Sequence, residues 1–161
     1  MIPFDPMDIL LAHNAWANQQ MLNACAKLTE EQFHRRFEMG PGSLHDTVTH
    51  VIGAMRRWGD VLAVRADRPR IEGTRRSVSE LMAMHEEAAA DLAETAKKYP
   101  QDQIITATRG TRTISGPRSA ILAHVATHGM HHRAQCLNML RHVGVSPLPP
   151  SSILEWGLLR Q

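Results

Sequence analysis

HVATHGMHHRAQ, residues 124–135, is the stretch with the densest chemistry in the chain, because it holds four of the ten histidines. His124, His128 and His132 recur at i, i+4 and i+8, so on an α-helix their side chains form one stripe, with each turn displaced by about 40°. Two imidazoles one turn apart can converge on a single ion, which makes His-x-x-x-His on a helix typical of half a metal site. The same spacing also occurs on solvated helix faces, and by itself the stretch leaves both interpretations open.

A general base of the zinc-protease kind is missing from this stretch. In that version of the motif a Glu directly follows the first His and acts as the base. Here Gly129 follows His128, and no carboxylate lies between His124 and Arg141. The sequence therefore excludes a base of that type on this helix.

The composition is that of an ordinary globular domain. The chain has 161 residues, of which 43% are hydrophobic and 21% are charged, so it is long enough to bury a real core. We therefore expect one domain over residues 1–161. The formal net charge of +2 is too small and too dispersed to indicate a nucleic-acid partner, although the isoelectric point lies near 8.8.

The compartment is inferred from the cysteines and from the N-terminus. Cys25 and Cys136 are far apart and form no Cys-x-x-Cys pair, which favours a reducing compartment with two packed thiols. The N-terminal MIPFDPMD has no basic region followed by an apolar run, so we do not expect it to act as a signal peptide. No apolar run reaches the length of a membrane span. We expect a cytoplasmic protein without a membrane partner.

Four long amphipathic segments alternate with breaks that carry Gly and Pro. Apolar residues recur at helical spacing in each segment, and the segments cover residues 5–28, 43–65, 77–99 and 117–143. Asp5, Ser43 and Ser77 stand where N-caps are expected, and Gly144 follows the last segment. The sequence therefore predicts an all-α four-helix bundle, a fold in which cofactor sites form between facing helices.

A β-branched stretch interrupts this helical pattern before the last long helix. Residues 103–115 are rich in Ile and Thr and carry Gly110 in the middle, which predicts a small hairpin or an extended arm. A lone hairpin is only marginally stable, so it must lean on the helices. Ser151 and Ser152 then predict a short terminal helix.

Two histidines elsewhere could complete a metal site. His50 sits among apolar residues on the second long segment, and by itself it is typical of a half-buried histidine. His85 lies on the apolar stripe of the third long segment and competes with His50 as a third ligand. Periodicity alone does not decide between them, and it leaves a contact from His124 to the ion open as well.

Three groups of residues together resemble the DinB/YfiT-like family of metalloenzymes. They are Asn-Ala-Trp-Ala-Asn at residues 14–18, Ser43 followed by His50, and His-x-x-x-His-Arg-x-Gln at residues 128–135 with its Gly144 and Pro147 tail. The resemblance covers almost the whole chain. It implies an up-down-down-up four-helix bundle, a homodimer, and a divalent transition metal, nickel or zinc, held by His50, His128 and His132.

The resemblance also implies a use for the site. Relatives include thiol S-transferases that work with bacillithiol, mycothiol or glutathione, so we expect a metal-dependent thiol S-transferase with a small thiol or electrophile as its partner. One alternative is a non-enzymatic dimeric stress-response or metal-binding protein with a structural ion. A second alternative is a metal-dependent hydrolase. The family name refers to damage-inducible expression and is no evidence of DNA binding, and whether this chain is an enzyme stays open.

Activation of water for hydrolysis needs a proton acceptor near the ion. His124 and His131 are the candidates by sequence, and His124 is alternatively a residue that packs beside the site or against the hairpin. Arg133 and Gln135 either orient the last helix or its partner chain, or simply lie on the helix surface.

Overall fold

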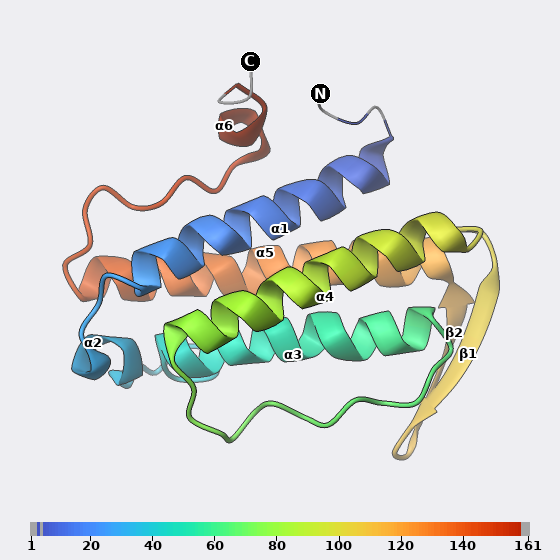
Figure 1. Ribbon diagram of the computed structural model, residues 1–161, viewed down its shortest axis with the longest axis horizontal. Helices are drawn as coiled ribbons and strands as arrows, with labels where there is room; N and C mark the ends of the chain where they lie inside the picture. The colour runs from blue at the N-terminus through green and yellow to red at the C-terminus, as the bar shows by residue number, and fades with distance from the viewer. Residues whose placement is uncertain (1–2, 4, 159–161) are drawn as a thin grey trace.

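The computed structural model describes residue 3 and residues 5–158, and it is built around four long helices. In chain order these are α1 Pro6–Cys25, α3 Leu44–Leu62, α4 Val78–Lys98 and α5 Arg118–His142. In Figure 1, α3 and α4 run parallel to each other and antiparallel to α1 and α5, because residues 63–77 return along the length of the bundle. This is the expected all-α bundle with up-down-down-up connectivity.

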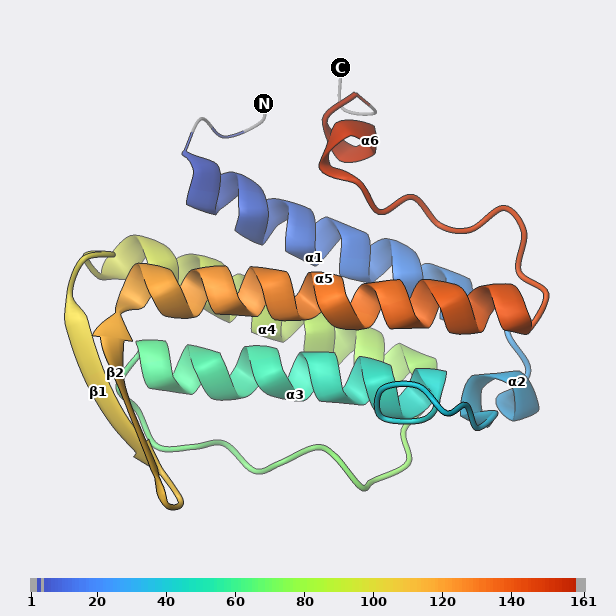
Figure 2. The same cartoon turned by 180° about the vertical axis from the view of Figure 1, so that it is seen from behind.

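Each long helix packs against two others, so the four close into a ring. α3 contacts α4 and α5, and α1 also contacts α4 and α5. Seen from behind, in Figure 2, α5 lies between α1 and α3. α3 and α5 are thus direct neighbours, and α4 lies across the ring from α5.

Side-chain caps begin the helices where the sequence predicts them. Asp5 accepts hydrogen bonds from the amides of Met7 and Asp8, and Ser43 accepts one from the amide of Asp46. Ser77 and Glu80 form a complete capping box at the start of α4. A short helix, α2 (Glu30–His34), begins with a second capping box at Thr29. The long helices end up to three residues before the predicted positions.

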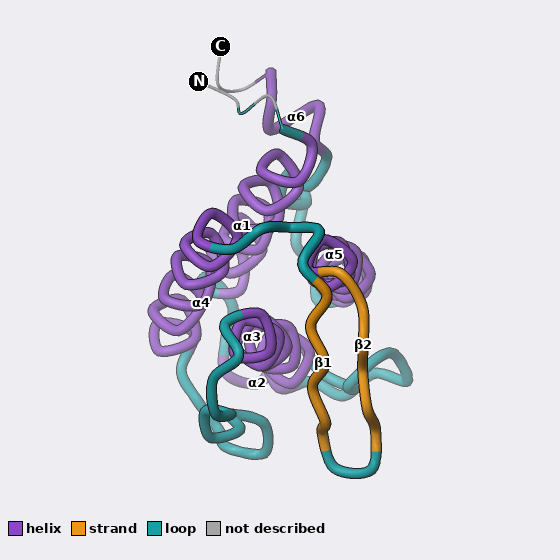
Figure 3. Tube along the Cα trace, turned by 90° about the vertical axis from the view of Figure 1, so that its right-hand side faces the viewer, coloured by secondary structure: helices purple, strands orange, loops and turns teal. Residues whose placement is uncertain are grey.

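The predicted hairpin is present, with strands β1 (Ile104–Arg109) and β2 (Arg112–Pro117). The strands are antiparallel, and hydroxyl pairs join Thr106 to Ser115 and Thr108 to Thr113. Ile105 is buried in the core of the bundle. Figure 3 shows the hairpin beside the ends of α3 and α5, so it covers one end of the α3–α5 groove.

The last described helix, α6 (Ile153–Leu158), contacts α1. Trp156 is fully buried, and a long extended segment after α5 carries the chain back to this place. Within the described residues, no helix has both the length and the apolar character that crossing a membrane requires.

Candidate metal centre

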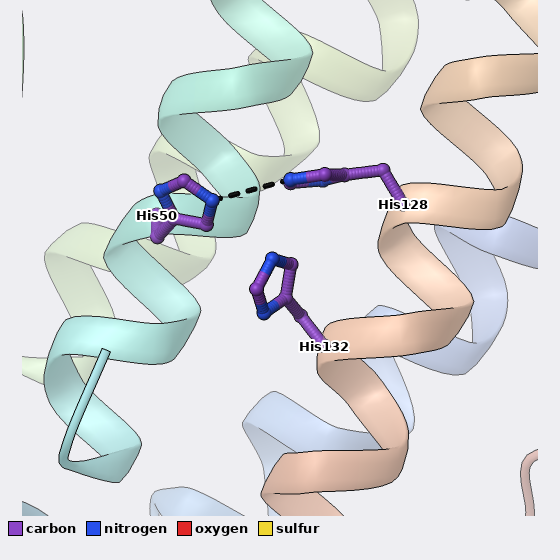
Figure 4. A group of neighbouring side chains, drawn as sticks. All are labelled: His50, His128 and His132. Atoms are coloured by element: carbon purple, nitrogen blue, oxygen red, sulfur yellow. Dashed lines mark hydrogen bonds between the residues drawn. The ribbon is translucent and has the colours of Figure 1, made fainter. Parts of the chain in front are cut away.

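Three imidazoles from two neighbouring helices meet in the groove between α3 and α5. His50 comes from α3, and His128 and His132 come from successive turns of α5. One ring nitrogen of each lies within 4.8 Å of the others, and the Nε2 atoms of His50 and His128 are 3.1 Å apart. All three side chains are half-buried, and in Figure 4 their rings face one common space.

This donor set fits a divalent transition metal. Zinc binds imidazole nitrogen at about 2.0–2.1 Å, and two such ligands at the tetrahedral angle lie about 3.3 Å apart. The spacing of His50 and His128 is close to that value. Three neutral nitrogens match zinc and nickel, whereas calcium and magnesium prefer oxygen. That these residues are ligands stays a prediction, and the geometry agrees with it.

The surroundings keep the three rings neutral, which leaves lone pairs free for a metal. Burial lowers the pKa of His50, and the neighbouring His132 and Arg57 lower it further. Burial and the adjacent histidines lower the pKa of His128 to about 4. Burial also lowers the pKa of His132, although a hydrogen bond from its ring to Gln135 opposes that shift.

Gln135 sets the orientation of His132. The Nδ1–H of His132 donates to Oε1 of Gln135 at 2.8 Å, which leaves Nε2 as the nitrogen with the free lone pair. The amide Nε2 of Gln135 in turn donates to Nε2 of His131 at 3.1 Å. A side chain on Gly40 would overlap the Gln135 amide, so the glycine at this position keeps Gln135 in place. The alternative of a plain surface role for Gln135 is thereby corrected.

The other candidate histidines lie outside the group. His85 is buried on α4, and the structure does not bring it to the cluster because α4 lies across the ring from α5. His124 is exposed, with its ring centroid 5.0 Å from Trp58 and 5.5 Å from His128. His131 is exposed as well, 4.9 Å from the His132 ring.

An ion pair beside His50 was missed by the sequence reasoning. Arg57 on α3 pairs with Glu72 from the segment between α3 and α4, and both charges act on the pKa of His50. Arg57 lies seven residues after His50, on the same helix face, which was a usable signal. Glu72 gave no such signal in the sequence, because its position in space depends on the path of an irregular segment.

A cavity of about 500 Å³ adjoins the cluster, and His128 is part of its wall. Trp58, Val61 and Ile114 form apolar parts of the lining, and four arginines contribute to the rest. Three of those arginines are paired with carboxylates: Arg57 with Glu72, Arg68 with Asp60 and Asp91, and Arg109 with Asp67. The cavity therefore combines an apolar wall with a largely neutralised charged rim.

Arg133 and the Asn-Ala-Trp-Ala-Asn segment lie outside the histidine cluster and join two helices. Arg133 is buried and donates to the side-chain oxygens of Asn14 and Asn18 on α1. These contacts join α5 to α1, on the face of α5 opposite to the cluster. Trp16, between the two asparagines, is only half-buried.

The bundle and its histidine cluster define a helical protein with three histidines that could hold a metal ion. A family model described as the DinB family matches residues 4–153, and the chain belongs to that family. Protein DinB of Bacillus subtilis (strain 168) is 25% identical over 150 residues, with 87% of each chain covered. The crystal structure of a DinB-like protein from Bacillus subtilis matches with a TM-score of 0.65 and 14% identity over 89% of this chain and 97% of that one, which supports the fold.

Proposed function

We propose that His50, His128 and His132 bind nickel or zinc, and that the protein is a metal-dependent thiol S-transferase. The observation that carries the proposal is the position of the cluster: three half-buried, neutral imidazoles lie together, and one of them, His128, lines a cavity of about 500 Å³. A site that only held the fold together would gain nothing from an adjoining cavity of substrate size.

A bound divalent cation supplies an electrophilic centre that lowers the pKa of a thiol or of water at its open positions. A base of the protein would take the thiol proton while the sulfur forms its bond to an electrophilic carbon. That carbon would release a leaving group or the electron pair of its double bond, and the base would return the proton there. Of the two candidate bases, His124 is the better placed, because its ring lies beside both Trp58 and His128. His131 hydrogen-bonds to Gln135 instead.

The cavity lining favours a small substrate with both an apolar and a polar part. Trp58, Val61 and Ile114 offer an apolar wall. Arg70 also lines the cavity, and no ion pair engages it within the described residues. A thiol or electrophile that carries a carboxylate would match this combination.

The test measures metal content and turnover in the same preparation. Protein purified without an affinity tag is reloaded with nickel or zinc and analysed for metal, and a panel of low-molecular-weight thiols is assayed with electrophilic substrates. We expect about one equivalent of metal and turnover with at least one thiol. Less than roughly 0.1 equivalent after reloading would contradict the metal site itself.

A variant pair separates a catalytic from a structural ion. His132→Ala removes one ligand, and His142→Ala removes an exposed histidine at the end of the same helix. If the ion is catalytic, His132→Ala loses turnover and keeps most of its apo stability. A metal-loaded protein without thiol turnover, which unfolds when the metal is removed, would favour the structural alternative.

A further inference from the structure

A second cavity lies on the other face of α5. It has a volume of about 340 Å³, is open to solvent on one side, and is lined by α1, α5, the segment before α6 and the start of α6. Ala126, Met130 and Arg133 of α5 line it, and these residues point away from the face that carries His128 and His132. The cavity is therefore separate from the candidate metal centre.

The charge of Arg133 has no counter-ion in this cavity. Its side chain is only 2% exposed. Its Nε donates to Oγ of Ser151 at 3.0 Å, and its Nη1 donates to Oδ1 of Asn14 at 3.2 Å and of Asn18 at 3.0 Å. All of these acceptors are neutral, and within the described residues no carboxylate pairs with Arg133 and no hydrogen bond engages its Nη2.

The contrast with the other arginines is informative. Arg65 and Arg68 are more exposed than Arg133, and yet each of them pairs with Asp60 and Asp91. Among the described residues Arg118 is the other buried arginine; no carboxylate pairs with it either, but its guanidinium lies 4.3 Å from the centroid of the Tyr99 ring and so makes a cation–π contact. A buried cation without a partner anion is unfavourable, and a bound anion would relieve this cost.

The neighbours of Arg133 do not neutralise it. Burial lowers the pKa of the guanidinium to about 10, which still leaves it charged near neutral pH. His13 also lines the cavity, and both burial and the Arg133 charge lower its pKa, so it is neutral there. Arg133 is therefore the charged side chain of the described lining, and the nearby Glu155 carboxylate is already engaged by the backbone amides of Ser151 and Ser152.

Most of the remaining wall is apolar. Leu10 and Ala126 lie at its inner part, and three large apolar side chains stay solvent-exposed around it: Met130 at 58%, Ile153 at 41% and Leu154 at 75%. A cavity of this size takes a small molecule, with one charged group to orient it and apolar contacts along its length.

We propose that this cavity binds a small aliphatic carboxylate, with its carboxylate paired to Nη2 of Arg133 and its chain against Met130, Ile153 and Leu154. A guanidinium that is already fixed by Ser151, Asn14 and Asn18 is pre-organised for this pairing. The proposal does not depend on the metal centre.

The test uses octanoate as the probe, with octanol and octylamine as matched ligands of the same chain length. Binding is followed by calorimetry and by the methyl resonance of Met130 in protein labelled at the methionine methyls. We expect saturable octanoate binding that shifts the Met130 signal, and binding of the two matched ligands at least about tenfold weaker. Equal binding of octanol, or no shift at Met130, would overturn the proposal.

The test variant leaves Arg133 in place, because this residue joins α1 to α5. Met130→Glu places a carboxylate beside the cavity on an exposed position and should weaken octanoate at least about tenfold at an unchanged unfolding midpoint. Ile104→Glu is the control, since Ile104 is 62% exposed and lies on the hairpin. Unaltered octanoate affinity in Met130→Glu, or an equal loss in Ile104→Glu, counts against the site.

Discussion

One amide decides which nitrogen of His132 faces the cluster. Gln135 accepts the Nδ1–H of His132 and so keeps Nε2 unprotonated. Removing the amide in Gln135→Ala leaves the ring free to rotate and to change tautomer. We expect the affinity for zinc or nickel to fall by about 10–100-fold, measured by competition with a chromophoric chelator.

The matched control for Gln135 is Asn138→Ala, an exposed amide one turn further along α5. Its side chain makes only a long contact to the sulfur of Met39. The metal affinity of this variant should equal that of the wild type. If the two variants behaved alike, the orienting role of Gln135 would be refuted.

His85 makes the stability of the protein depend on pH. Its ring is 2% exposed, and neither nitrogen has a hydrogen-bond partner within the described residues. Burial lowers its pKa from 6.5 to about 4. Below pH 6.5 His85 is protonated in the unfolded chain but stays neutral in the folded chain. The contribution of neutral His85 to stability is therefore complete above pH 6.5 and is lost as the pH falls towards 4.

Urea unfolding of metal-free protein at several pH values tests whether the free energy of unfolding falls as the pH is lowered. A shift of this size corresponds to about 3 kcal/mol between neutral pH and pH 4. In His85→Leu the free energy of unfolding should fall by about 3 kcal/mol less between neutral pH and pH 4. The variant should be at least as stable as the wild type at neutral pH, since a buried polar group without a partner is removed. An unchanged pH dependence would exclude His85 as the source.

At the scale of the helices, Gly129 fixes how closely α1 and α5 approach. A methyl group on Gly129 would overlap the side-chain oxygen of Asn14, which is buried and accepts a hydrogen bond from Arg133. Alanine is the better helix former by about 1 kcal/mol. The displaced hydrogen bond to a buried cation outweighs this gain, so Gly129→Ala should lower the free energy of unfolding by about 1–3 kcal/mol.

Chemical denaturation of Gly129→Ala is compared with that of Gly116→Ala, in which the added methyl group meets no atom within 4 Å. The second change should be close to neutral. A stabilised Gly129→Ala would mean that Asn14 can move without loss, and that the close approach of α1 to α5 has no energetic role.

The helices themselves could be predicted from the sequence because their signals are local. Asp5, Ser43 and Ser77 cap the helices they precede, and the β-branched run around Gly110 forms the hairpin. The helix ends were less predictable, since the residues that end a helix depend on packing at the bundle ends. Local pattern also said little about which polar side chains would be buried between helices.

The site could be predicted only in part, because spacing within one helix says nothing about its neighbours. His128 and His132 follow from their spacing on α5, whereas His50 and His85 had equal standing on apolar faces. The ring order decides between them, since α3 borders α5 and α4 does not. That order came from the family resemblance, and neither periodicity nor composition contains it.

At the scale of the whole molecule, the connection from α3 to α4 is fixed by a charge network. Asp60 is buried and accepts hydrogen bonds from Nε of Arg65 at 2.7 Å and from the amide of Arg68 at 3.0 Å. Both arginines also pair with Asp91 on α4. The parallel arrangement of α3 and α4 thus depends on residues 60–68 holding the start of the long connection.

Asp60→Ala should therefore lower the free energy of unfolding by about 2–3 kcal/mol, because it leaves two partly buried guanidinium groups without one of their acceptors. Glu94→Ala, an exposed carboxylate on α4, is the control and should change stability little. Chemical denaturation measures both. Equal effects of the two variants would show that the network does not hold the connection.

A metal at the cluster would join the two halves of the molecule, because its ligands come from α3 and α5, which run in opposite directions in the bundle. Any ligand that binds only the folded chain stabilises it by mass action, by about 2.7 kcal/mol at 100 times its dissociation constant. For a chain of this length that corresponds to a rise in unfolding temperature of about 5–10 °C. Thermal unfolding with and without zinc should show this rise in the wild type and in the control His142→Ala, and none in His132→Ala. Because His132→Ala keeps His50 and His128, a rise as large as that of the wild type in this variant would show that His132 is not a ligand of the stabilising ion.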